Sequence, residues 1–89
     1  MYTILIVEDD ERIAEKLSSA ISKYDFNARI IDDFSRVMDI FTDTKPDLVL
    51  LDVNLPKYDG FYWCRQIRTQ SHCPIIFISA RDSGMDQIM

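Results

Sequence analysis

Residues 48–60 read LVLLDVNLPKYDG and decide the fold. An apolar run ends abruptly in one carboxylate, Asp52, and a turn that contains Pro56 leads through Gly60 into a helix-like pattern. Such a run predicts a buried strand with Asp52 at its C-terminal end. In open α/β sheets, ligands bind in the crevice beyond the carboxyl ends of the strands, so Asp52 stands where a site is expected.

A second run of this kind opens the chain. Residues 3–7 are apolar or β-branched and lead directly into Glu8, Asp9 and Asp10. If the two strands are neighbours, Asp9 and Asp52 converge at one edge of the sheet. Two bare carboxylates about 4 Å apart repel by about 4 kcal/mol at an effective dielectric near 20, and a hard divalent cation relieves that repulsion. Mg2+ fits best, since it takes oxygen ligands and commonly binds one or two carboxylates together with a phosphate.

The acids at positions 8–10 also have a purely structural interpretation, because acidic side chains often stabilise the first turn of a helix. Asp52 weighs against it, since Asp52 precedes a turn and caps nothing obvious. A carboxylate held against Mg2+ can act as a nucleophile toward a phosphoryl group and form an aspartyl phosphate. Ser79 follows a later apolar run, and its hydroxyl could donate to such a phosphoryl group or bond only to local backbone. Spacing alone leaves both roles of Ser79 open.

The rest of the chain alternates apolar runs with amphipathic segments. The apolar runs predict strands over residues 3–7, 28–31, 48–51 and 75–78. Apolar residues three and four apart predict helices over 11–24, 34–42 and 60–69, the second capped by Asp32 or Asp33, with a loop over 79–84 and a helix start over 85–89. Strands that alternate with helices predict an α/β fold, in which helices cover both faces of a parallel sheet.

The aromatic residues near position 60 have two interpretations. The simpler one expects Phe61 to pack on the sheet, while Tyr58, Tyr62 and Trp63 lie partly on the surface. The alternative is a docking surface for a partner protein, because such residues are favoured at the centre of interfaces.

Bulk composition narrows the class of protein. A chain of 89 residues, 47% hydrophobic and 28% charged, suits one globular domain. The net charge of -5 argues against nucleic acid as a direct partner, because phosphate binding needs clustered Lys and Arg. No apolar run approaches the roughly 20 residues of a membrane span. We therefore expect a cytoplasmic protein without direct membrane contact, with Cys64 and Cys73 as free thiols.

Four segments together resemble the receiver domain of bacterial two-component response regulators: residues 7–10, 50–56, 59–60 and 78–80. The resemblance implies a flavodoxin-like, doubly wound parallel sheet with the strand order 2-1-3-4-5. It implies that Asp52 is the phosphoacceptor and that Ser79 is the switch hydroxyl. It also implies Mg2+ as cofactor, with Asp9 and Asp52 binding by side chain, Asn54 by its backbone carbonyl and Glu8 through water. The implied phosphoryl donor is a sensor histidine kinase.

The resemblance is nearest to the N-terminal part of regulators with a winged-helix DNA-binding domain, of the kind that answer cell-envelope and peptide-antibiotic stress. The fifth strand and fifth helix of the family are missing, so we expect residues 1–89 to be a receiver domain that is incomplete at its C-terminus. DNA would then be contacted only through an effector domain that is absent here. We also expect that residues 1–89 either associate with a second copy, through the edge of the fourth strand or the face of the first helix, or are the ordered remnant of a longer chain.

Two other classes of function stay open. The chain could be an interaction fragment that no longer signals because it is incomplete. It could also be a magnesium-dependent aspartyl phosphohydrolase. That class needs a second carboxylate two residues after the nucleophile, and Asn54 stands there instead.

Overall fold

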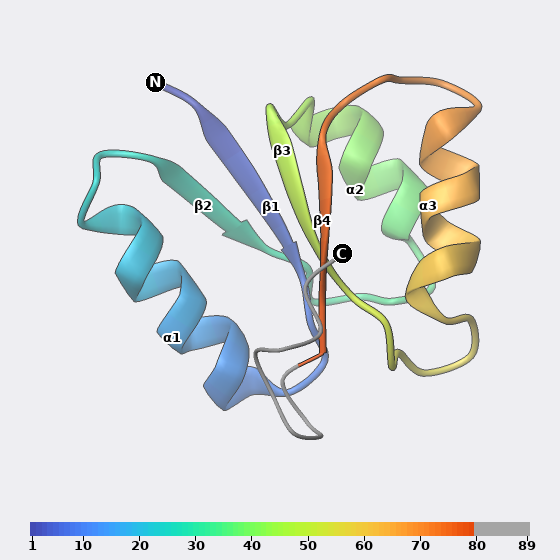
Figure 1. Cartoon of the computed structure of the whole chain (residues 1–89), viewed down its shortest axis with the longest axis horizontal. Coiled ribbons are helices and arrows are strands. Elements are labelled where there is room, and N and C mark those ends of the chain that lie inside the picture. Colours follow the sequence, from blue (N-terminus) through green and yellow to red (C-terminus); the bar gives the residue numbers. More distant parts are fainter. Residues whose placement is uncertain (80–89) are drawn as a thin grey trace.

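The computed structural model describes residues 1–79, which form a four-stranded sheet and three helices (Figure 1). The elements in chain order are β1 (Thr3–Val7), α1 (Glu11–Ser22), β2 (Asn27–Ile30), α2 (Val37–Thr44), β3 (Leu48–Asp52), α3 (Gly60–Arg68) and β4 (Ile75–Ile78). All strand pairs are parallel and the strand order is β2-β1-β3-β4. The predicted α/β fold and its strand order are confirmed. The predicted loop after Ser79 and the predicted helix start over 85–89 lie outside the described residues.

Helices cover both faces of this sheet. Helix α1 packs on β1 and β2, whereas α2 and α3 lie side by side on the other face, against β1 and β3 (Figure 1). The central strands are apolar on both faces, as parallel strands between helices must be. Alternate residues of β1 and β3 enter the larger core with residues of α2 and α3. This core contains Leu5, Val7, Val49, Leu51, Val37, Ile40, Phe41, Trp63 and Ile67.

The start of α2 differs from the prediction. We expected a helix over residues 34–42, but α2 begins at Val37 and its N-cap, Arg36, makes no capping hydrogen bond through its side chain. Asp33 instead accepts hydrogen bonds from the backbone N–H and the hydroxyl of Ser35, at 3.0 and 2.6 Å, which closes a turn before the helix. At its other end α2 continues to Thr44, where Lys45 adopts a left-handed φ of 50° and stops it.

The other boundaries shift by one or two residues. Helix α1 ends at Ser22, because the chain soon turns through the left-handed φ of 66° at Asp25. Strand β2 covers Asn27–Ile30 rather than 28–31, and α3 ends one residue earlier than predicted. Strand β3 extends one residue further, to Asp52, whose partner in β4 is Ile78. The last shift matters for function, since it makes Asp52 part of the sheet.

Trp63 is the buried aromatic residue of α3, which corrects the expectation that it lies partly on the surface. Its exposed fraction is 8%, against 38% for Phe61. Phe61 still contacts the sheet, because its ring centroid is 4.9 Å from that of Phe77 in β4. The rings of Tyr58 and Tyr62 stack at 4.1 Å, and both meet the Trp63 ring edge-on. The aromatic cluster is thus anchored in the core through Trp63.

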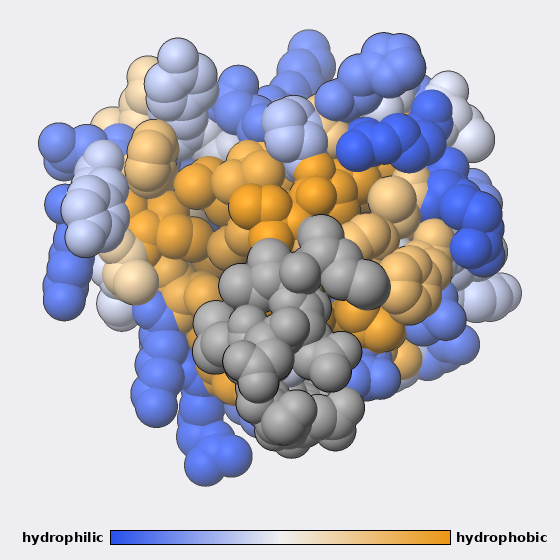
Figure 2. All heavy atoms as spheres, viewed as in Figure 1, coloured by the Kyte–Doolittle hydropathy of each residue, from blue (hydrophilic) through white to orange (hydrophobic). Residues whose placement is uncertain are grey.

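One face of the molecule is rich in apolar side chains. Figure 2 shows them gathered over the strands between α1 and α3, with hydrophilic side chains around them. Ile13, Leu17 and Ile21 of α1 are half-buried. Association through this helix face or through the β4 edge stays a prediction. Among residues 1–79, no helix combines the length and the apolar character that crossing a bilayer requires.

Candidate acidic site

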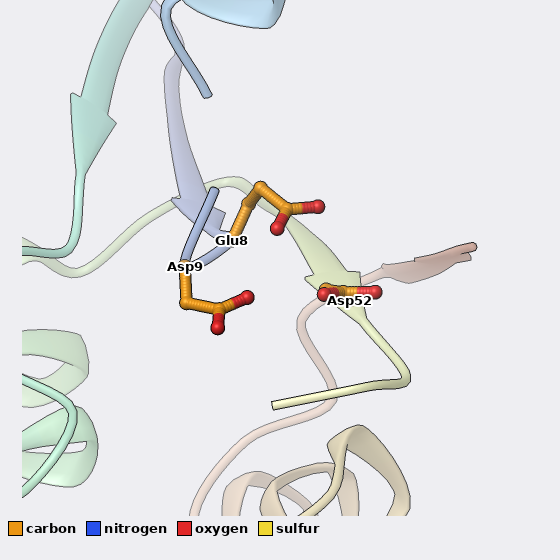
Figure 3. Close-up of side chains that lie close together, drawn as sticks. All are labelled: Glu8, Asp9 and Asp52. Atoms are coloured by element: carbon orange, nitrogen blue, oxygen red, sulfur yellow. The ribbon is translucent and has the colours of Figure 1, made fainter. Parts of the chain in front are cut away.

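Three carboxylates meet at the carboxyl edge of the sheet. Glu8 and Asp9 follow the end of β1, and Asp52 ends β3 (Figure 3). Each offers an oxygen, and these oxygens all lie within 4.8 Å of one another. Asp52 is 0% exposed and Glu8 is 2% exposed, while Asp9 is half-buried. The structure therefore brings together three of the five residues assigned to the site from the sequence.

The sheet register explains this convergence. Val7 of β1 pairs with Leu51 of β3, so the next residues, Glu8 and Asp52, reach the same edge side by side. Asp10 has a different task. Its carboxylate accepts hydrogen bonds from the backbone N–H groups of Arg12 and Ile13, at 3.0 and 3.4 Å, and caps α1. The structural interpretation of the acidic run thus holds for Asp10, while Glu8 and Asp9 are the acids that lie beside Asp52.

Glu8 lies in an environment that disfavours the charged form of its carboxyl group. Burial raises the pKa of its carboxyl from the ordinary 4.5 to about 7, and the charge of Asp52 together with hydrogen bonds to Asp52 and Asp9 adds to the rise. The backbone N–H of Asp10 donates to Glu8 Oε2 at 2.9 Å and works in the opposite direction. A buried carboxyl beside two others is most easily ionised when a cation is present. The oxygen ligands and their spacing fit a hard divalent ion.

The loop after Asp52 is tied to the end of β3. The backbone N–H of Asn54 donates to Asp52 Oδ1 at 3.2 Å, so Asp52 does cap a local turn, contrary to expectation. Val53 N–H donates to the carbonyl oxygen of Ile78 at 3.1 Å, and Gly60 N–H donates to that of Val53 at 3.0 Å. Asn54 thus reaches the site through its backbone, while its side chain is exposed.

The structure explains why glycine stands at position 60, next to the site, which the sequence did not reveal. It begins α3 directly against the end of β3. A methyl group at this position would overlap the backbone carbonyl oxygen of Asp52 and press on Val53 Cα, at 3.1 Å. Only glycine permits this approach of backbone to backbone. A Gly after the turn was the available signal, but the contact depends on the tertiary packing of α3.

Ser79 follows β4 and is 9% exposed. Because Asp52 pairs with Ile78, Ser79 lies one position beyond the neighbour of Asp52 on the adjacent strand. Its hydroxyl thus belongs to the same edge of the sheet as the three carboxylates.

Comparison with known proteins gives one family. The profile of the response regulator receiver domain matches residues 4–88. The chain is 54% identical over 86 residues to "Response regulator protein GraR" of Staphylococcus haemolyticus, covering 97% of this chain. It is 56% identical over 89 residues to "Uncharacterized transcriptional regulatory protein YvcP" of Bacillus subtilis, covering 100% of this chain. In both cases it spans only 38% of the relative's own length.

Solved structures agree with the sequence relatives. The N-terminal domain of the nisin resistance regulator NsrR, described as a lantibiotic response regulator, superposes with a TM-score of 0.85 and 36% identity. That match covers 98% of this chain and 74% of the other. The BeF3-activated N-terminal receiver domain of Klebsiella pneumoniae RstA gives a TM-score of 0.83 and 34% identity, over 94% of this chain and 72% of the other.

Proposed function

The chain belongs to the family of response regulator receiver domains, and from this premise we propose that Asp52 accepts a phosphoryl group from a sensor histidine kinase. The observation that carries the proposal is the position of Asp52, fully buried at the end of β3 with Glu8 and Asp9 beside it. A nucleophile that stays ionised in such a place needs a cation for charge balance.

The residues present fit Mg2+ as the cofactor. We propose that Asp9 and Asp52 hold it by side chain, Asn54 by its backbone carbonyl, and Glu8 through a water molecule. When bound, the ion neutralises charge on the carboxylates and on the incoming phosphoryl oxygens. One oxygen of Asp52 bonds to phosphorus, while the other accepts from the Asn54 N–H, which fixes the plane of the carboxylate. The hydroxyl of Ser79 then donates a hydrogen bond to a phosphoryl oxygen, and Ser79 acts as the switch residue.

We propose a signalling module rather than an enzyme with a substrate of its own. Its output passes to an effector domain, which is transcriptional in regulators of the kind this chain resembles, and DNA is contacted only through that domain. A homodimer is the further partner that we propose, and the cytoplasm is the location that the resemblance implies. The similarity to NsrR, a nisin resistance regulator, suggests peptide-antibiotic stress as the stimulus.

Intact-mass analysis after treatment with acetyl phosphate and Mg2+ tests the proposal. The wild type should gain one phosphoryl group, and Asp52→Asn should gain none. Asp32→Asn is the matched control, since Asp32 is an exposed acid near the same edge, beside Glu8 and Asp9, and should keep the adduct. An adduct that persists in Asp52→Asn refutes the assignment. Hydrolysis of many phosphate esters without an adduct would favour the phosphohydrolase, and no reaction at all would favour a non-signalling interaction module.

A further inference from the structure

Lys57 has an unusual backbone conformation. Its φ is 67°, in the left-handed region that glycine adopts easily and a lysine rarely does. The N–H of Tyr58 donates to the carbonyl oxygen of Pro56 at 2.8 Å, so Lys57 is the central residue of a tight three-residue turn. The other non-glycine residues with positive φ in the described part, Asp25 and Lys45, follow the ends of helices, where this conformation is common. Lys57 follows no helix, and a strained residue beside a site points to a function.

The loop that carries Lys57 is held firmly. It begins after Asp52 at the end of β3 and ends at Gly60, the first residue of α3. The N–H of Gly60 donates to the carbonyl oxygen of Val53 at 3.0 Å, which closes the loop. Next to Lys57, the ring of Tyr58 stacks on that of Tyr62 at 4.1 Å. The left-handed turn therefore has a fixed place, five residues after Asp52 and at the same edge of the sheet.

Lys57 is also an exposed positive charge, and it forms no ion pair with residues 1–79. Two other cations near this edge are partly neutralised, since Arg12 lies 3.8 Å from Asp10 and Arg36 lies 3.7 Å from Asp39. For Lys57, no carboxylate oxygen of residues 1–79 lies within 4.0 Å of its ammonium group.

The charge of Lys57 reaches across the edge of the sheet. The pKa of Asp33, in the segment between β2 and α2, is lowered chiefly by hydrogen bonds from Ser35, and the charges of Arg36 and Lys57 add to this. Lys57 thus lies near enough to Asp33 for its charge to be felt there. Asp32 of that segment lines a hollow together with Glu8 and Asp9.

An acidic edge is a poor place to receive an anion. Glu8, Asp9 and Asp52 repel a phosphoryl donor that carries negative charge, as does the net charge of -5. We propose that Lys57 is a positioning residue that draws the anionic phosphoryl donor toward Asp52, from the fixed position that the left-handed turn gives it. This inference rests on the proposed function of Asp52.

The transfer itself stays with Asp52. One of its oxygens forms a bond to phosphorus, and the bond from phosphorus to the donor's leaving group breaks. The leaving group departs with the electron pair, as acetate when the donor is acetyl phosphate. Lys57 changes only how often the donor arrives. One positive charge about 10 Å from a dianion in water raises its local concentration about two- to fourfold at low ionic strength.

Three variants separate the charge of Lys57 from its backbone strain. Lys57→Arg keeps the charge and the strain, Lys57→Gln removes only the charge, and Lys57→Gly removes both. The second-order rate of adduct formation is measured by intact mass at saturating Mg2+, at low and at high NaCl concentration. Two donors are compared, acetyl phosphate as a dianion and phosphoramidate as an ion of lower net charge with a P–N bond like that of phosphohistidine.

We expect Lys57→Gln and Lys57→Gly to be slower with acetyl phosphate by about two- to fourfold at low salt, and Lys57→Arg to match the wild type. The loss should be smaller with phosphoramidate and should vanish at high salt. Equal rates for Lys57→Gln and the wild type at low salt overturn the inference, as does a loss that salt does not change. Absence of an adduct in the wild type would instead refute the function proposed for Asp52, so the two failures are distinguishable.

Discussion

Replacing Glu8 by Gln should stabilise the metal-free protein, and the gain should grow with pH. The pKa of Glu8 is raised from 4.5 to about 7 on folding, chiefly by burial. Between these values the folded state keeps a proton that the unfolded state has lost, so the stability of the wild type falls as pH rises. At 1.36 kcal/mol per pKa unit, the full shift amounts to about 3 kcal/mol above pH 7. Gln cannot ionise and escapes this loss.

The amide fits the local hydrogen bonds. Its carbonyl oxygen can still accept from the Asp10 N–H, which donates to Glu8 Oε2 at 2.9 Å. Its NH2 group then points toward Asp52 and Asp9 and can donate hydrogen bonds to their carboxylates, whereas an ionised Glu8 would be repelled by them. Urea unfolding of both proteins in metal-free buffer, from pH 4.5 to pH 8, gives the difference in the free energy of unfolding. Titrating groups remote from the acidic site contribute equally to both proteins and cancel in that difference.

The difference should lie near its smallest value at pH 4.5 and rise by about 3 kcal/mol by pH 8. Glu15→Gln is the control, because it makes the same substitution at an exposed acid on α1. A difference between Glu8→Gln and the wild type that stays flat across this range would refute the reasoning. It would show that the buried carboxyl is not the source of strain at the site.

Three further predictions concern the metal, the loop and the core. Millimolar Mg2+ should raise the thermal midpoint of the wild type, by mass action on the folded state, and should not raise that of Asp52→Ala; equal shifts would count against the site. Gly60→Ala should lower the free energy of unfolding by about 3 kcal/mol or more in urea melts, because the methyl group overlaps the Asp52 carbonyl, and a loss below about 1 kcal/mol would contradict the contact. Trp63→Ala should lower the free energy of unfolding by about 3–5 kcal/mol, and Phe61→Ala should lower it clearly less, because their exposed fractions are 8% and 38%. A larger loss for Phe61→Ala would instead favour the sequence-based expectation that Phe61 is the more buried of the two.

The sheet was predictable because its signals are local. Apolar runs that end in acids mark the strands and show where each strand ends. The alternation of these strands with helices predicts that they are parallel. The start of α2 was not predictable in this way. Asp33 stands at a suitable place for a cap, yet its side chain closes a turn with Ser35, and the helix begins only at Val37. Two hydrogen-bonding patterns compete for the same carboxylate, and nothing in the spacing ranks them.

The acidic site shows where sequence reasoning stops. Glu8, Asp9 and Asp10 share one functional group, so composition gives all three the same possible roles. The backbone assigns them: Asp10 faces the first turn of α1 as its cap, while Glu8 and Asp9 face Asp52 on the neighbouring strand. Glu8 is the acid that the fold both buries and places against Asp52, and this environment raises its pKa. The motif therefore locates the site, but the register of β1 against β3 gives each acid its chemistry.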